Sequence, residues 1–146
     1  MGCKKEPERF FELNNVTLLP PSPGKDKLKT IEQYVSILYT NLFQEALAPS
    51  SVYEISIAIE SVGDFELARE VLISNFMNKP GVYLPTEAEM NADLEAFITE
   101  TYNRFLIRNP TEAETTWFKN YISSNPNIRP EIVYFSFALS DEYMYY

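Results

Sequence analysis

Pro110-Thr111-Glu112-Ala113-Glu114 repeats, residue for residue, the pentapeptide found at 85–89. In each copy a threonine stands three residues before a glutamate: Thr86 before Glu89, and Thr111 before Glu114. This is the spacing of a capping box, in which the hydroxyl and the carboxylate each accept a hydrogen bond from the other residue's backbone amide. Acidic residues also favour the positive end of a helix dipole. Both sites are therefore predicted to be helix starts; the alternative is acidic clusters for a metal or for acid–base catalysis.

Working outward from these sites, apolar residues recur at three- and four-residue spacing, which indicates helices rather than strands. Asp64 and Pro130 are suited to further helix starts, whereas Pro49 interrupts the pattern and is expected in a loop. The helix from Thr86 is expected to run unbroken to Asn109.

We predict an all-α fold of about six helices in two similar three-helix units, packed into one helical bundle and preceded by an extended N-terminal tether. The expected boundaries are 1–29 for the lipid-attachment site and tether, 30–80 for the first unit and 81–146 for the second.

Composition excludes several kinds of site. The 146 residues carry 12 basic and 21 acidic side chains, a formal net charge of −9, which disfavours binding to nucleic acid. Histidine is absent and Cys3 is the only cysteine, which removes the usual neutral-pH base and the common zinc ligands. No apolar run is long enough to span a bilayer. We therefore predict no catalytic residue, no metal and no cofactor.

Cys3 follows Gly2 at the start of a polar, proline-bearing stretch. Gly2-Cys3 resembles the lipidation junction of bacterial lipoproteins, which implies a lipid on Cys3 and a place in the cell envelope, at the outer membrane or the periplasmic face. One alternative is dual acylation at a cytoplasmic membrane face, although Glu6 stands where that motif has Ser or Thr. The other is a free thiol on a soluble protein.

Two groups of residues are candidates for binding a protein partner. The tether contains apolar side chains that a pure linker does not need, and these are expected to dock either on the helical domain or on a partner chain. The last four residues contain three tyrosines, a residue type enriched at interfaces. The tyrosine tail either packs back on the bundle or docks on another protein. The candidate residues are Phe10, Phe11, Leu18, Leu19, Tyr143, Tyr145 and Tyr146.

The last third of the chain has the pattern Tyr-x-x-x-Leu-x-Arg-x-Pro, then an acid and a Trp, then Ser-x-Glu-aromatic. The matching residues are Tyr102, Leu106, Arg108, Pro110, Glu114, Trp117, Ser140, Glu142 and Tyr143. This region resembles the α-helical repeat domain of phycobilisome-linker-like and related bacterial surface proteins. It departs at Thr115-Thr116, where that family often has Asp-Gly. The resemblance implies a small protein-interaction module with no enzymatic activity and no metal.

Two residues of this pattern have expected structural roles. Arg108 is predicted to bind the last carbonyls of the helix that precedes it, and Trp117 to anchor a short helix in the core. The alternatives for Arg108 are a surface ladder with Glu100 and Arg104 or the binding of a ligand, and the alternative for Trp117 is a stacking platform.

These observations favour a lipid-anchored accessory or adaptor protein of a membrane complex, acting by protein–protein interaction. A soluble helical module with a ligand pocket between the two units is the second hypothesis. The third is an enzyme that uses carboxylates such as Glu54, Glu60, Asp64 or Glu66.

Overall fold

The computed structural model describes residues 24–146, which contain seven α-helices, one 3₁₀ turn and no β-strand. The all-α prediction is thus confirmed for this part of the chain. The helices are α1 (Ile31–Phe43), α2 (Pro49–Val62), α3 (Phe65–Met77), α4 (Glu87–Ala92), α5 (Leu94–Leu106), α6 (Glu112–Ser124) and α7 (Pro130–Leu139), followed by the 3₁₀ turn η1 (Glu142–Met144).

The two copies of the pentapeptide form the capping boxes that their sequence predicts. The Thr86 hydroxyl accepts from the Glu89 amide at 3.2 Å, and Glu89 accepts from the Thr86 amide at 2.7 Å. Thr111 and Glu114 repeat both bonds at the same distances. Asp64 caps α3 as expected, since its carboxylate accepts from the Leu67 amide at 3.1 Å.

The helix expected from Thr86 to Asn109 is in fact two helices. Asp93 leaves the helical region, with φ −149° and ψ 87°, and its carboxylate accepts from the Ala96 amide at 2.9 Å. An aspartate that caps a new helix competes with the continuation of the old one. Residues 24–146 therefore contain seven helices where the periodicity predicts about six.

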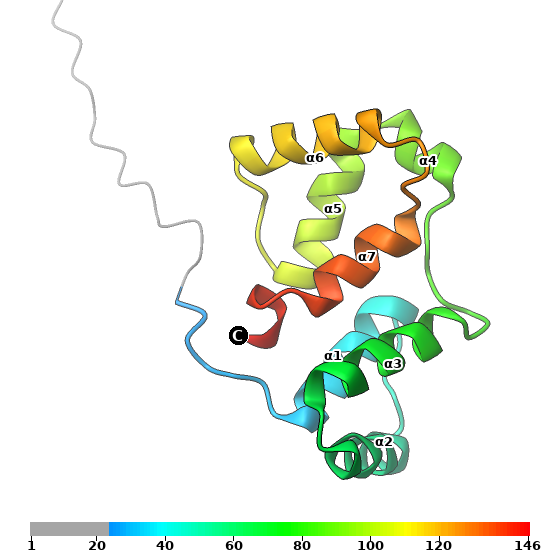
Figure 1. The fold of residues 1–146 in the computed structure, drawn as a ribbon, viewed down its shortest axis with the longest axis vertical. Helices are drawn as coiled ribbons and strands as arrows, with labels where there is room; N and C mark the ends of the chain where they lie inside the picture. The colour runs from blue at the N-terminus through cyan, green and yellow to red at the C-terminus, as the bar shows by residue number, and fades with distance from the viewer. Residues whose placement is uncertain (1–23) are drawn as a thin grey trace, which may run out of the picture.

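The helices pack mostly against their neighbours in sequence, and the most extensive long-range contact is made by α7. The three pairs among α1, α2 and α3 are in contact, and α5 contacts both α4 and α6. Helix α7 contacts α3 as well as α5 and η1. In Figure 1, α7 accordingly lies between α1–α3 below and α4–α6 above.

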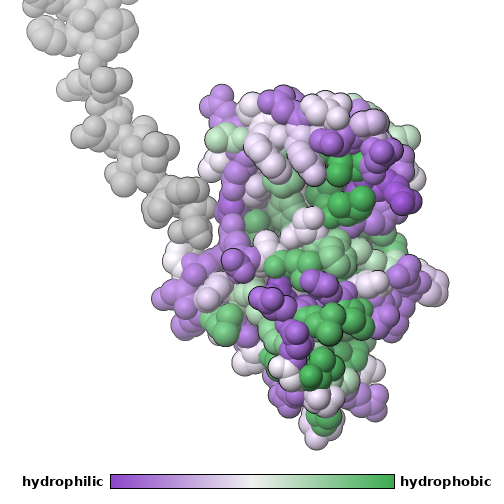
Figure 2. All heavy atoms as spheres, viewed as in Figure 1, coloured by the Kyte–Doolittle hydropathy of each residue, from purple (hydrophilic) through white to green (hydrophobic). Residues whose placement is uncertain are grey.

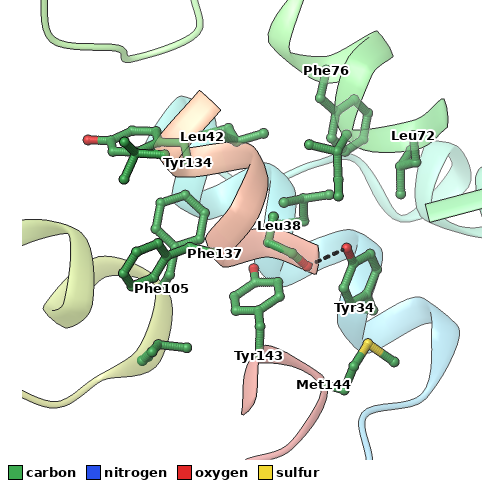
Figure 3. Close-up of a cluster of buried hydrophobic side chains, with 14 of the residues drawn as sticks. Tyr34, Leu38, Leu42, Leu72, Phe76, Phe105, Tyr134, Phe137, Tyr143 and Met144 are labelled. Atoms are coloured by element: carbon green, nitrogen blue, oxygen red, sulfur yellow. Dashed lines mark hydrogen bonds between the residues drawn. The ribbon is translucent and has the colours of Figure 1, made fainter. Parts of the chain in front are cut away.

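A single hydrophobic core extends across all of these contacts. Its largest fully buried side chains include Tyr34 of α1, Phe76 of α3, Tyr134 of α7 and Tyr143 of η1 (Figure 3). The Tyr34 hydroxyl donates to the carbonyl of Ala138 at 3.0 Å, so the polar tip of this tyrosine is satisfied inside the core.

The charged segment before α1 pairs with the C-terminus. The amide of Lys29 donates to the Met144 carbonyl at 2.8 Å, and the amide of Tyr146 donates to the Lys27 carbonyl at 2.9 Å. Leu28 and Tyr145 form an isolated antiparallel bridge. The end of the predicted tether, residues 25–29, is therefore held against the helical body rather than solvated as a whole.

Candidate functional site

An open groove of about 280 Å³ lies between α2 and α3 and is lined almost entirely by aliphatic side chains. We call it the α2–α3 groove. Val62, Leu67 and Val71 in its wall are each 51–53 % exposed. Figure 2 shows hydrophobic side chains at the surface over these helices. The lining residues are Ile55, Ala58, Ile59, Val62, Leu67, Ala68, Val71, Leu72 and Asn75.

The groove follows from the composition of its two helices. Ile55, Ile59 and Val62 recur at helical spacing along α2, and Leu67 and Val71 along α3. The α3 core side chains, such as Phe76, project from another face of that helix. Because α3 is apolar on more than one face, burying one face leaves a second apolar stripe at the surface. Large exposed apolar patches of this kind are typical of interaction sites.

Acidic side chains surround the aliphatic residues in the sequence of both helices. Glu60, Glu66 and Glu70 are all exposed. They are not drawn into a deep cleft, and the same holds for Glu54 and Asp64. Within residues 24–146 no group of three or more acidic or cysteine side chains is placed to hold a metal.

A second charged region joins the N-terminal segment, the loop after α5, the start of α6 and η1. We call it the C-terminal junction, and Arg108 is at its centre. Its guanidinium donates to both carboxylate oxygens of Glu142, at 2.7 and 2.8 Å, and to both of Glu114, at 2.8 and 2.9 Å. Lys25 adds an ion pair to Glu142 at 3.2 Å. Two cations thus balance two carboxylates.

This pairing lowers the pKa of both carboxyl groups, which keeps them charged. Hydrogen bonds from Arg108, opposed by partial burial, lower the pKa of Glu114 to about 2. The same guanidinium, assisted by Lys25, lowers the pKa of Glu142. The hydrogen bonds from the two carboxylates raise the pKa of Arg108. Charges compensated in this way stabilise the loop and helix ends, and we assign the junction a structural role.

The predicted role of Arg108 as a cap for the preceding helix is wrong. The carbonyl of Leu106, in the last turn of α5, instead accepts from Lys25. Arg108 lies over the ring of Tyr102, 4.8 Å from its centroid. Several residues that carry the family resemblance are therefore neighbours in space, which the sequence pattern could not establish.

Trp117 does not anchor α6 in the core. It is 57 % exposed, whereas its neighbour Phe118 packs partly against the core. The Trp117 ring stacks on Tyr121, with centroids 5.0 Å apart and planes at 7°. Residues 117 and 121 lie on a different side of α6 from the buried Ile122, which explains why an aromatic side chain can remain outside.

The tyrosine tail divides between the two predicted alternatives. Tyr143 is 1 % exposed, and its phenol oxygen accepts from Asn41 at 2.9 Å. It therefore packs back on the bundle, and its side chain has no free face for a partner. Tyr145 and Tyr146 stay partly exposed, although their backbones pair with residues 27 and 28.

Lys29 holds this tail in place from a buried position. Its ammonium donates to the carbonyls of Tyr143 and of Tyr145, the latter at 2.9 Å. It also lies 4.5 Å from the centre of the Tyr143 ring. Burial, together with the nearby charge of Lys25, lowers the pKa of Lys29 to about 8.

Arg69 is a buried residue that the sequence reasoning missed. It occupies the inner face of α3 and donates to the last carbonyls of α7, to Ala138 at 3.3 Å and to Leu139 at 2.9 Å. Its guanidinium also lies over the ring of Tyr34, 5.2 Å from the centroid. Arg69 occupies a position of the α3 pattern where an apolar residue is expected. A buried arginine needs hydrogen-bond acceptors from another element, so this position could have indicated its role.

The remaining predicted site residues, Cys3, Phe10, Phe11, Leu18 and Leu19, lie outside the described part of the chain. Among the helices of residues 24–146, none has the length and apolarity needed to cross a bilayer.

Known proteins give no further guide to the site. Comparison with protein-family models, with curated proteins and with solved structures finds no match to this chain.

Proposed function

We propose that this protein is a helical protein-interaction module, an adaptor or accessory subunit of a larger membrane complex, that binds its partner in the α2–α3 groove. The observation that carries the proposal is the half-exposure of Val62, Leu67 and Val71 in one open groove. These apolar side chains are exposed to water in the isolated chain. Covering them with a partner stabilises the complex by about 25 cal/mol per Å² of apolar area buried.

The chemistry of the groove specifies the partner. Aliphatic residues from two adjacent helices suit an amphipathic helix that presents apolar side chains at three- and four-residue spacing. Glu60, Glu66 and Glu70, together with the net charge of −9, favour basic residues beside those anchors.

A lipid on Cys3 would hold the module at the bacterial envelope, with the residues before the helical body as a tether. This part of the proposal rests on the Gly2-Cys3 junction and the polar, proline-bearing stretch that follows it. Metabolic labelling with a palmitate analogue tests it: the wild type takes up label, and Cys3→Ser does not. An unlabelled wild type in the soluble fraction would contradict the anchor.

We also infer a two-part organisation of the body, with α1–α3 as one three-helix unit and α5–α7 as the other. The contacts among α1, α2 and α3, and those of α5 with α6 and α7, support this division. Such a body would hold the groove on the first unit and leave the second free for other contacts.

The test of the groove uses two polar substitutions and a matched control. Leu67→Gln with Val71→Gln replaces two exposed apolar side chains by a good helix former. Ile57→Gln is the control, because Ile57 is 46 % exposed on α2 and does not line the groove. A photo-crosslinking residue is placed at Asn75, at the edge of the groove, in each background expressed in the native host.

We expect a discrete crosslinked product in the parent and in Ile57→Gln, and its loss in the double variant. Mass spectrometry of the product must identify an amphipathic segment with basic flanks. Equal crosslinking in all three chains, or a product that is a second copy of this chain, would contradict an adaptor that binds through the α2–α3 groove.

The two alternative functions have weaker support. The contact between α7 and α3 is filled by core side chains (Figure 3), which leaves less room for a ligand between the two halves. The carboxylates considered for catalysis, Glu54, Glu60, Asp64 and Glu66, are exposed side chains on or beside α2 and α3 rather than facing one another in a cleft.

A further inference from the structure

A second surface feature lies between α6 and α7, next to the C-terminal junction. It is a hollow of about 200 Å³, with an apolar floor that includes Tyr102, Leu106, Phe118 and Phe137. Arg108, Glu114 and Glu142 line the same hollow, and their charges are already paired with one another. We call it the α6–α7 furrow. Its available chemistry is therefore aromatic and apolar rather than ionic.

Exposed aromatic rings extend the furrow along α6. Phe118 in its wall contacts Trp117 edge to face, with centroids 4.8 Å apart. Trp117 in turn stacks on Tyr121, and both rings remain about half exposed. A row of Phe, Trp and Tyr at the surface is the kind of platform on which proline-rich segments bind, since such segments are already extended and lose little entropy.

The chain itself arrives at one end of this furrow. Lys25 donates to Glu142 at 3.2 Å and to the carbonyl of Leu106, and both of those residues line the furrow. Residue 25 is thereby fixed at the rim. The residues immediately before it in the sequence are Pro20-Pro21-Ser22-Pro23-Gly24, preceded by Leu18 and Leu19.

The geometry points to the α6–α7 furrow as the docking site for this chain's own segment Leu18–Pro23. A polyproline II segment rises about 3.1 Å per residue, so the five steps from Lys25 back to Pro20 reach about 15 Å. The Lys25 side chain contacts Glu142, and Arg108 joins Glu142 to Glu114 in the first turn of α6. The segment before residue 25 therefore begins at the end of the furrow where α6 starts, and it is long enough to extend along the furrow from there.

Docking in cis has a concentration advantage over any other occupant. Only Gly24 separates Pro23 from the anchored Lys25, so closing the contact restrains very few residues. The inference does not depend on the α2–α3 groove, which lies on other helices and is tested separately.

Trp117 is the only tryptophan in the chain and packs against Phe118 in the furrow wall, so its fluorescence reports on this part of the surface. The experiment compares three full-length chains: the parent, the triple variant Pro20→Ser, Pro21→Ser and Pro23→Ser, and the matched control Pro7→Ser. Emission maximum and quenching by acrylamide are measured over a range of protein concentrations. A peptide with the sequence of residues 17–24 is then added to the triple variant.

We expect the parent and Pro7→Ser to share a blue-shifted emission and weak quenching, and the triple variant to shift to the red and quench more strongly. The peptide should partly reverse both changes. Identical spectra in all three chains would overturn the proposal. A blue shift that disappears on dilution of the parent would also overturn it, because the occupant would then come from a second copy.

Discussion

The C-terminal junction and the α2–α3 groove differ in the pairing and the exposure of their side chains. In the junction, two cations meet two carboxylates at 2.7–3.2 Å, and Tyr143 beside them is buried. In the groove, aliphatic side chains remain half exposed, and the acids next to them in the sequence of α3, Glu66 and Glu70, are exposed as well.

The difference separates residues that hold the fold from residues available to a partner. A paired, partly buried charge contributes to stability only in its own geometry, so removing one member leaves the other uncompensated. A half-exposed aliphatic residue contributes less to the fold and can be changed at small cost. Substitutions in the two regions should therefore have clearly different consequences for stability.

The largest expected effect comes from the buried tyrosine of the junction. Tyr143→Ala removes a ring that packs edge to face against Tyr34 and Phe105, with centroids 5.6 and 5.8 Å away. We expect a loss of about 3–5 kcal/mol in the free energy of unfolding, the range for deleting a buried aromatic side chain. Urea denaturation followed by circular dichroism measures it.

Tyr146→Ala is the matched control for this substitution. Tyr146 is 51 % exposed, and its hydrogen bonds to Lys27 are made by its backbone. We expect a change within about 0.5 kcal/mol. A similar loss in both variants would mean that the tail as a whole, rather than the buried ring, stabilises the protein.

The next effect is a loss of stability at low pH that arises from the carboxylates of the junction. The pKa of Glu114 is about 2 in the folded chain, below its ordinary value of 4.5, and that of Glu142 is also lowered. The unfolded chain therefore binds more protons in this window, so the stabilisation is complete above pH 4.5 and is lost as the pH falls towards 2. Unfolding free energies measured at intervals across that window test the sign.

Arg108→Gln tests whether the loss of stability at low pH arises from the carboxylates of the junction or from acids elsewhere. We expect it to cost about 2 kcal/mol at neutral pH, less than for a fully buried pair because Glu114 and Glu142 remain partly exposed. It should also flatten the decline between pH 4.5 and 2. An equally steep decline in Arg108→Gln would assign the acid sensitivity to carboxylates elsewhere.

The smallest effect is expected in the groove. Leu67→Gln with Val71→Gln should lower the free energy of unfolding by no more than about 1 kcal/mol, because both side chains are half exposed. Thermal unfolding, compared with that of Ile57→Gln, measures the difference. A loss as large as that of Tyr143→Ala would show that the groove belongs to the core, and the contrast between the two regions would not hold.

Local sequence signals predicted much of the helical structure. The capping boxes at Thr86 and Thr111 and the cap at Asp64 are formed as expected, because each needs only residues three positions apart. The break at Asp93 was missed although its signal is local, since an aspartate inside an apolar repeat can either face solvent or cap a new helix.

The candidate sites were harder to predict than the helices. Trp117 and Tyr143 are both aromatic residues in helical patterns, yet one is exposed and the other buried. Their exposure depends on which neighbour covers them: η1 folds back beneath α5 and α7, whereas no described element covers the outer side of α6 at Trp117. Sequence spacing contains no information on that choice.

The sequence by itself determined the all-α class, most helix starts and the exclusion of histidine-dependent chemistry, because these follow from short-range hydrogen bonds and from composition. Only the tertiary structure decided that Arg108 binds Glu114 and Glu142 while Lys25 takes the helix-end carbonyl. It also decided that the exposed apolar surface lies on α2 and α3. Apart from Arg108 and Glu114, which are six positions apart, these pairings join residues 34 to 117 positions apart. They depend on how the helices pack, and that packing is set by the whole core rather than by any one segment.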